Sequence, residues 1–346
     1  MDGHAADPTD DFLAGKVIMP AAMPPDQARS VVDLFYRSIL GRPADPYGSE
    51  LHTNLLVSGE IDERGLALGF FNSDEFKIRT GALEAFLDQV VIEAFGSKFL
   101  LPRSWTAELT APEGYENWVI PYFLSLCRPG MTIVDVGASI GSLALPAARH
   151  VLPGGSVYAI EVSPLNCSLL AQSITLNELD NVHLLPLGVS DYLGFARLPR
   201  QRMSNNNVID RERDTKPTDI RSHDMVPIVP FDLLHPAIGK IDLMKMDIEG
   251  MEYRACMGAI NALKHDRPMV FLEYSPEFQR QWSGVPGVRL LGLFQELGYS
   301  FEILHRTKDR ELVTDPDPAA RIDAAWAEHC ALDGGSHLDL CLHPSA

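Results

Sequence analysis

One stretch of the chain, residues 131–161, limits the possible folds more than any other. It predicts a strand, a glycine-rich turn, a helix and a second strand in direct succession. Ile133, Val134 and Val136 form a short β-branched run that is typical of a strand buried on both faces of a parallel sheet. The helix is expected over residues 143–151 and the second strand over residues 157–160. This order predicts a βαβ unit.

Small residues form the turn of this unit. Gly137 and Gly141 bracket the turn, and Ala138 and Ser139 keep it open, so that backbone N–H groups at the start of the helix can approach a ligand. Glu161 ends the second strand, 24 residues beyond Gly137. At about this spacing an acid reaches the ribose hydroxyls in nucleotide-binding βαβ units. We therefore expect a cofactor that contains a nucleoside.

The turn differs from the dinucleotide fingerprint GxGxxG, because Ala138 and Ser139 stand where the second glycine would be. Asp135, just before the first glycine, would repel a pyrophosphate but attract the ammonium end of an amino-acid cofactor. These residues favour S-adenosylmethionine (SAM). The segment DVGASIG resembles the first motif of class I SAM-dependent methyltransferases. The resemblance implies that Asp135 lies beside the cofactor and that Glu161 binds its ribose.

A second stretch, KIDLMKMDIEGME (residues 240–252), predicts a buried strand that ends in two acids. Ligands bind beyond the carboxyl ends of strands in open α/β sheets, so Asp247 and Glu249 are expected at the cofactor crevice. Either carboxylate could act as the general base for a hydroxyl nucleophile, and Asp247 could also hold the ammonium group of SAM. These two acids are our candidate catalytic residues. Together with Glu273 they would also suit Mg²⁺, but we assign no metal.

This second stretch resembles the lKiDvEGaE signature of the FkbM-type methyltransferases. With DVGASIG, LGVSD and the pair Leu272-Glu273, the resemblance covers roughly residues 115–342. It implies O-methylation of a hydroxyl group on a sugar or a natural-product small molecule. Ser139 departs from the family pattern, which usually has asparagine there. The cofactor contacts expected on this basis are Glu116, Asp135, Gly137, Ala138, Ser139, Gly141, Glu161, Val162, Gly188, Val189 and Asp247.

Three histidines are alternative candidates for the general base, and a polar loop is a candidate for contacts with the acceptor. His183, His223 or His235 could accept a proton only if the fold brings it to the crevice, and a lone surface histidine is the simpler interpretation. The polar loop over residues 200–223 is expected to be a lid on the substrate side. Within it, residues 205–207 (Asn-Asn-Asn) could bind hydroxyl groups of an acceptor.

Helices and strands alternate through most of the chain. Strands are expected at 182–186, 226–229, 241–248, 269–274, 299–305 and 337–342, and helices at 83–95, 164–176, 252–263 and 288–297. A late pair of strands after five βα units is how the class I methyltransferase sheet ends. We predict an α/β fold: a Rossmann-like sheet of the class I methyltransferase type, mostly parallel with an antiparallel last strand, after a small all-helical domain.

Three regions make up the predicted domain organisation. Residues 1–26 lack periodicity and are expected to be a flexible arm. Residues 27–100 are expected to form the small helical domain, and residues 101–346 the methyltransferase domain. The string VVDLFYRSILGRPADPYGSELHTNLLVSGEIDERGLALGFFNSDEF, over about residues 30–80, resembles the domain family DUF4214. His52 stands where that family usually has tryptophan.

Composition restricts the partners. The chain has 29 Lys plus Arg against 47 Asp plus Glu, and this net charge of -18 argues against a nucleic-acid or anionic membrane partner. The five cysteines have no paired spacing, and neither a signal-peptide pattern nor a run of ~18 apolar residues is present. We expect a cytoplasmic protein that acts on a small hydroxylated acceptor: a sugar, or a molecule derived from a polyketide or peptide.

A hypothesis from another functional class fits the same residues. The α/β domain could bind SAM or NAD without turnover and act as a regulatory module, with the helical domain docking a partner. The two hypotheses differ in which cofactor binds and in whether a methylated product forms.

Overall fold

The computed structural model describes residues 23–40, 42–73, 88–110, 116–199, 223–306, 309–333 and 336–345. The chain divides into two compact units, Met1–Leu83 and Glu84–Ala346. The arm expected over residues 1–26 and the loop expected over 200–223, with the asparagines at 205–207, lie almost wholly outside the described residues.

Helices build the described part of the first unit. They are α1 (Pro25–Ile39), α2 (Pro46–Ser58) and α3 (Glu63–Asn72). The carboxylates of Asp45 and Asp62 cap α2 and α3 by accepting the backbone N–H groups of Gly48 and Gly65. His52 packs in the core of this unit: its ring lies edge-on to Phe70, with centroids 4.9 Å apart.

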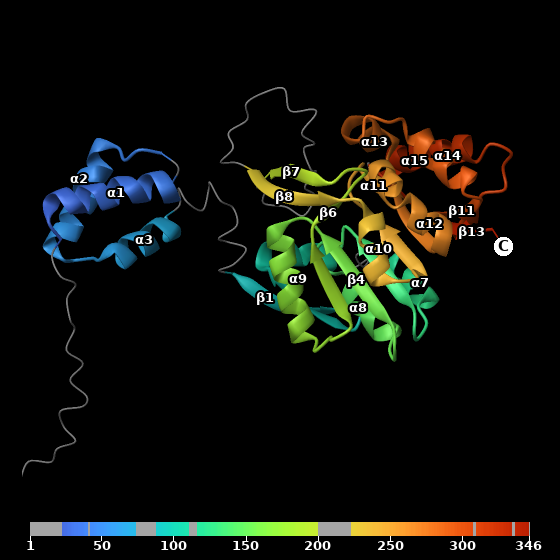
Figure 1. The fold of residues 1–346 in the computed structure, drawn as a ribbon, viewed down its shortest axis with the longest axis horizontal. Helices are drawn as coiled ribbons and strands as arrows, with labels where there is room; N and C mark the ends of the chain where they lie inside the picture. Colours follow the sequence, from blue (N-terminus) through green and yellow to red (C-terminus); the bar gives the residue numbers. More distant parts are fainter. Residues whose placement is uncertain are drawn as a thin grey trace, which may run out of the picture. The chain divides into compact units, whose positions relative to one another are not determined.

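An eight-stranded sheet forms the centre of the second unit, in the order β12-β11-β13-β10-β9-β3-β4-β5 (Figure 1). Its strands are β3 (Thr132–Val136), β4 (Ser156–Glu161), β5 (Val182–Pro186), β9 (Leu243–Met246), β10 (Met269–Tyr274), β11 (Tyr299–Leu304), β12 (Glu311–Leu312) and β13 (Leu338–Pro344). Strands β5, β4, β3, β9 and β10 run parallel, whereas β13 is antiparallel to both β10 and β11. The predicted mostly parallel sheet with an antiparallel last strand is confirmed.

Helices cover both faces of this sheet (Figure 1). One face packs against α7 (Ile120–Leu126), α8 (Ala144–His150) and α9 (Pro164–Leu176). The other packs against α11 (Glu252–Gly258), α12 (Ile260–Asp266), α14 (Gly287–Glu296) and α15 (Pro318–Asp333). Fully buried side chains such as Phe123 and Leu170 fill the first layer, and Phe294 and Ile322 fill the second. Two apolar layers therefore fix the sheet between its helices.

Smaller elements complete the second unit. They are a hairpin of β1 (Gln89–Ala94) and β2 (Ser97–Pro102), a sheet in the order β6-β8-β7 of β6 (Gly188–Val189), β7 (Gly194–Pro199) and β8 (His223–Val229), and the short helices α6 (Thr106–Leu109), α10 (His235–Ile238) and α13 (Pro276–Trp282). Among the described residues, no helix has the length and apolar character to cross a membrane.

The helix expected over residues 83–95 is wrong in its described part, which is strand β1. The backbone of its hairpin partner β2 is tied to α9, since Lys98 N–H donates to Asn177 Oδ1 at 2.9 Å and Leu100 N–H to Ser173 Oγ at 3.0 Å. These tertiary bonds override the helical spacing of the apolar residues. The hairpin consequently lies in the second unit, and the division between the units falls before it rather than near residue 100.

The helix expected over residues 252–263 is interrupted at Ala259. Gly258 there approaches a neighbouring backbone so closely that a Cβ atom would lie 2.0 Å from the carbonyl oxygen of Ser190. This approach lets α11 pack beside β6, and α12 begins at Ile260.

Gly137, directly after β3, lets two strand ends meet. Its φ is +86°, and a Cβ atom would lie 1.9 Å from the carbonyl oxygen of Asp247, directly after β9. Its N–H also donates to the carbonyl oxygen of Ile160 in β4, at 2.9 Å. A glycine is required because a side chain would push these three strand ends apart.

We expect Gly137→Ala to lower the melting temperature of the chain much more than Gly130→Ala. Both glycines have φ near +85°, so both alanines carry about 1–2 kcal/mol of backbone strain. A Cβ at Gly130 would meet nothing within 4 Å, whereas at Gly137 it would collide with backbone. Thermal unfolding followed by circular dichroism measures the difference. Equal melting temperatures for the two variants would contradict the close approach of β3 and β9.

Candidate active site

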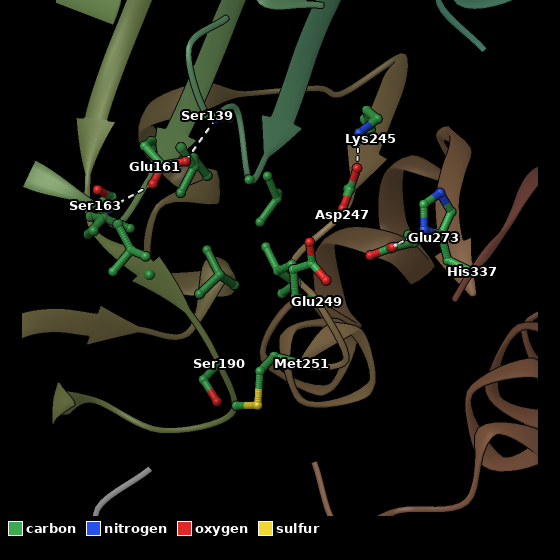
Figure 2. Close-up of a pocket in the computed structure, with 18 of the residues that line it drawn as sticks. Ser139, Glu161, Ser163, Ser190, Lys245, Asp247, Glu249, Met251, Glu273 and His337 are labelled. Atoms are coloured by element: carbon green, nitrogen blue, oxygen red, sulfur yellow. Dashed lines mark hydrogen bonds and ion pairs between the residues drawn. The ribbon is translucent and has the colours of Figure 1, made fainter. Parts of the chain in front are cut away.

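A cavity of about 370 Å³ opens at the carboxyl ends of β3, β4 and β9 (Figure 2). Most of the residues expected to bind a cofactor or to act in catalysis line it: Glu116, Gly137, Ser139, Glu161, Val162, Gly188, Val189, Asp247 and Glu249. Asp135, Ala138 and Gly141 do not line it. The volume lies within the range of about 300–1,000 Å³ that is usual for small-molecule sites.

Glu161 holds two turns at one wall of the cavity. One carboxylate oxygen accepts the N–H of Ser139 at 2.8 Å, and the other accepts the N–H of Ser163 at 2.7 Å (Figure 2). Burial raises the pKa of Glu161, and these backbone hydrogen bonds act against that rise. The backbone of Val162 and the side chain of Asn166 also hydrogen-bond to this carboxylate and act in the same direction.

The three predicted residues that do not line the cavity are buried or packed beside it; Ala138, for example, is 3% exposed and its N–H donates to the carbonyl oxygen of Ile160 at 3.0 Å. A Cβ atom at Gly141 would lie 2.5 Å from Leu170 Cδ1, so this glycine lets the turn pack against α9. Asp135 is 1% exposed and its Oδ1 has no hydrogen-bond partner. Its carboxyl group lies within electrostatic reach of Lys245, Asp247, Glu116 and Glu161, which do line the cavity, and a direct contact of Asp135 with the cofactor stays a prediction.

Lys245 carries an ammonium group into this buried region. It is 7% exposed, pairs in register with Asp135 and donates from Nζ to Asp247 Oδ2. Burial acts to lower the pKa of Lys245, but Asp247, Glu116 and Asp135 outweigh it and raise the value. Burial likewise acts to raise the pKa of Asp247, but Lys245, together with a hydrogen bond to Glu273, outweighs it and lowers the value to about 2. Asp247 is thus an ionised partner of Lys245 and a weak proton acceptor.

Glu249 has the opposite character. Burial, together with the nearby charge of Asp247, raises its pKa to about 7. Its φ of +57° is uncommon for a residue with a side chain and marks a strained backbone at the edge of the cavity. Glu252 holds this loop in place by accepting the N–H groups of Ile248 at 2.9 Å and Gly250 at 3.1 Å. A carboxyl group that titrates near neutral pH therefore projects into the cavity (Figure 2).

His337, which precedes β13, is a site residue that the sequence did not indicate. Its Nδ1 lies 3.1 Å from Oε1 of Glu273, a buried acid at the carboxyl end of β10, and both residues line the cavity opposite Glu161 (Figure 2). Burial, with Asp247 and Glu249 nearby, raises the pKa of Glu273. Trp118 and Arg306 line the same wall, with the guanidinium 4.7 Å from the indole centroid. His337 has no motif around it, and only the strand order brings it to the site.

The histidines that the sequence did single out lie elsewhere. The ring of His183 lies against Tyr158, with centroids 4.7 Å apart, and the Nε2 of His235 is 2.7 Å from Asp266. Neither residue lines the cavity. The side chain of His223 lies outside the described part of the chain. The acids expected to suit Mg²⁺ do converge, since one ligand atom each from Asp247, Glu249 and Glu273 lies within 4.8 Å of the others.

Two parts of the chain match models of known protein families. Residues 135–301 match the model of the methyltransferase FkbM domain, and residues 27–80 match the domain of unknown function DUF4214. Both resemblances noted in the sequence are thereby confirmed. Among the curated proteins, none was found to match the chain.

Solved methyltransferase structures also resemble the chain at low identity. A methyltransferase FkbM from Methylobacillus flagellatus KT is 17% identical over 89% of this chain and 58% of its own, with a TM-score of 0.38, so the chain spans under two thirds of that protein. TYW2 of M. jannaschii, solved with AdoMet, is 14% identical over 74% of this chain and 84% of its own, with a TM-score of 0.37. A precorrin-6y C5,15-methyltransferase from Geobacter metallireducens GS-15 is 12% identical over 67% and 89%, with a TM-score of 0.36.

Asp135 predicts a pH dependence of stability. Burial raises its pKa to about 7, although Lys245 acts to lower it, whereas the unfolded chain releases this proton near 3.8. Between these values the folded state binds more protons, so the free energy of unfolding falls as pH rises, by at most about 1.4 kcal/mol per pH unit. Urea unfolding from pH 5.5 to 7.5 should therefore show a shallower fall for Asp135→Asn than for the native chain. An unchanged slope, equal to that of the exposed control Asp180→Asn, would contradict this assignment.

Proposed function

Because residues 135–301 belong to the FkbM methyltransferase family, we propose that the chain transfers the methyl group of SAM to a hydroxyl oxygen of a sugar or another natural-product small molecule. One observation carries the proposal: the same cavity is lined by Glu161, at the position expected to bind a ribose, and by the acids Asp247 and Glu249. The expected partner is accordingly a small hydroxylated acceptor.

The residues around the cavity fit SAM. Glu161 offers carboxylate acceptors to ribose hydroxyls, and the side chains of Val162, Val189 and Ile228 give an apolar surface for the adenine. Acidic side chains outnumber Lys245 and Arg306 in the lining, which suits a cofactor with a net positive charge. A pyrophosphate, as in NAD, would bring negative charge to the same edge.

The two acids at the end of β9 have different parts in this proposal. When bound, SAM supplies a methyl group that is activated by its positive sulfur. Glu249, with a pKa near 7, accepts the proton of the acceptor hydroxyl. Asp247, kept ionised by Lys245, holds positive charge at the cavity edge instead. Both acids were candidate bases on sequence grounds alone, and the ion pair of Asp247 with Lys245 supports the choice of Glu249.

Cofactor choice is tested by calorimetric titration of the full chain with SAM and, separately, with NAD. We expect SAM to bind and Glu161→Gln to weaken its binding by about tenfold or more, the equivalent of roughly 1.5–3 kcal/mol for a hydrogen bond to a charged group. Exposed Glu296→Gln is the control, and circular dichroism checks that each variant folds. Binding of NAD but not SAM would favour the dinucleotide module, and unchanged SAM affinity in folded Glu161→Gln would place the cofactor elsewhere.

Turnover is tested with methyl-labelled SAM and a panel of hydroxylated sugars and polyketide- or peptide-derived acceptors. We expect Glu249→Gln to lower kcat by roughly 10²-fold, with little change in SAM affinity, and to remove a pH-rate limb near 7. Asp247→Asn should instead weaken SAM binding, because the cavity edge then lacks its ionised carboxylate, with an added loss of stability because Lys245 then lacks its buried anion. If Glu249→Gln keeps the kcat and the pH profile of the native chain, Glu249 is not the general base. Absence of labelled product with every acceptor, despite SAM binding, would favour a regulatory module.

A further inference from the structure

A second cluster of ligand-type side chains lies at the opposite edge of the sheet from the cavity. It consists of His235 at the start of α10, and His265 and Asp266 at the end of α12. These residues precede β9 and β10, so they lie at the amino ends of strands whose carboxyl ends border the cavity. One ligand atom from each of the three lies within 4.8 Å of the others.

Asp266 is the fixed centre of this cluster. Its side chain is 1% exposed, and each oxygen faces one imidazole: Oδ2 is 2.7 Å from His235 Nε2, and Oδ1 is 2.6 Å from His265 Nδ1. The N–H of Ile241 donates to Oδ2 at 2.8 Å and fixes the orientation of the carboxylate. The His265 side chain is 79% exposed, so one side of the cluster opens to solvent.

We propose that His235, His265 and Asp266 bind a zinc-type divalent transition-metal ion. Two imidazole nitrogens and a carboxylate oxygen are a donor set typical of Zn²⁺, with a fourth position left for water. Ligand bonds of about 2.0–2.1 Å in a tetrahedron place neighbouring donor atoms about 3.3 Å apart. The His235–Asp266 and His265–Asp266 contacts, at 2.7 Å and 2.6 Å, must each lengthen by about 0.6–0.7 Å to reach that spacing, so both imidazole rings move away from the carboxylate when the ion binds. The Ile241 N–H then orients the ligating carboxylate from the second shell of the ion.

The other mixed cluster among the described residues suits a cation less well. Glu302, Cys341 and His343 also lie within reach of one another. However, Arg310 Nη1 lies 3.3 Å from a Glu302 oxygen and would repel a cation, and Cys341 is 0% exposed. A cation near the proposed site is Lys240, whose Nζ donates to Asp242 Oδ1 at 3.0 Å rather than to Asp266, and the site has an open side.

The ion would join α10 to α12 just before β9, the strand that carries Lys245. A ligand that binds only the folded chain stabilises it by mass action. Zinc should therefore raise the melting temperature without entering the cofactor cavity.

The test uses the full chain, stripped of metal with a chelator and then dialysed. We expect titration with zinc chloride to give one ion per chain and a rise in melting temperature. His265→Ala should weaken binding at least tenfold and abolish that rise, and His235→Gln should weaken binding as well. His150→Ala, which removes an exposed histidine of α8, is the matched control and should bind as the native chain does.

Three results would overturn the proposal. They are no zinc binding by the native chain, equal zinc affinity in His265→Ala and the native chain, and loss of binding in Glu249→Gln or Cys341→Ser while His265→Ala still binds. Because His265 is exposed, we expect its variant to fold, and circular dichroism of the metal-free proteins verifies this.

Discussion

The contact between the ends of β3 and β9 determines the geometry of the whole site. Gly137 approaches the carbonyl oxygen of Asp247 so closely that no other residue fits, and its N–H is bonded to β4 through Ile160. The glycine-rich turn, Glu161 and the loop of Asp247 and Glu249 therefore come to one point. Without this backbone contact the three strand ends would still exist, but their functional groups would not share a cavity.

Burial of charge is the second constraint on the site. Burial raises the pKa values of Asp135, Glu249 and Glu273, and Lys245 is the buried cation set among them. Its direct partner, Asp247, has a lowered pKa of about 2. The site therefore holds an anionic carboxylate, Asp247, beside a carboxyl group, Glu249, that can exchange a proton near neutral pH. In the proposed function these are the tasks of holding a positive cofactor and accepting a proton.

Local patterns in the sequence predicted much of the sheet. The expected bounds of α9, β5 and β10 agree with the structure. Residues that start or end an element, such as Ser163-Pro164 before α9 and Pro186 at the end of β5, mark these bounds in the sequence. The turn and the acids at the strand ends were identifiable for the same reason. Their spacing along the chain reflects the βαβ geometry directly.

What the sequence missed depends on tertiary contacts. The hairpin of β1 and β2 exists because its backbone bonds to side chains of α9, far along the chain. His337 reaches the cavity only because β13 inserts between β10 and β11, and the pairing of Asp135 with Lys245 follows from strand register. The inequality of Asp247 and Glu249 likewise depends on Lys245, whose partner could not be chosen from spacing alone.

The most direct measurement of the central claim is a crystal structure of the chain with S-adenosylhomocysteine, the product of methyl transfer. The account predicts that the ribose hydroxyls lie within hydrogen-bond distance of the Glu161 carboxylate and that the sulfur faces the edge formed by Asp247 and Glu249. Density for the product at any other place on the chain, or in the cavity with its ribose away from Glu161, would contradict the account.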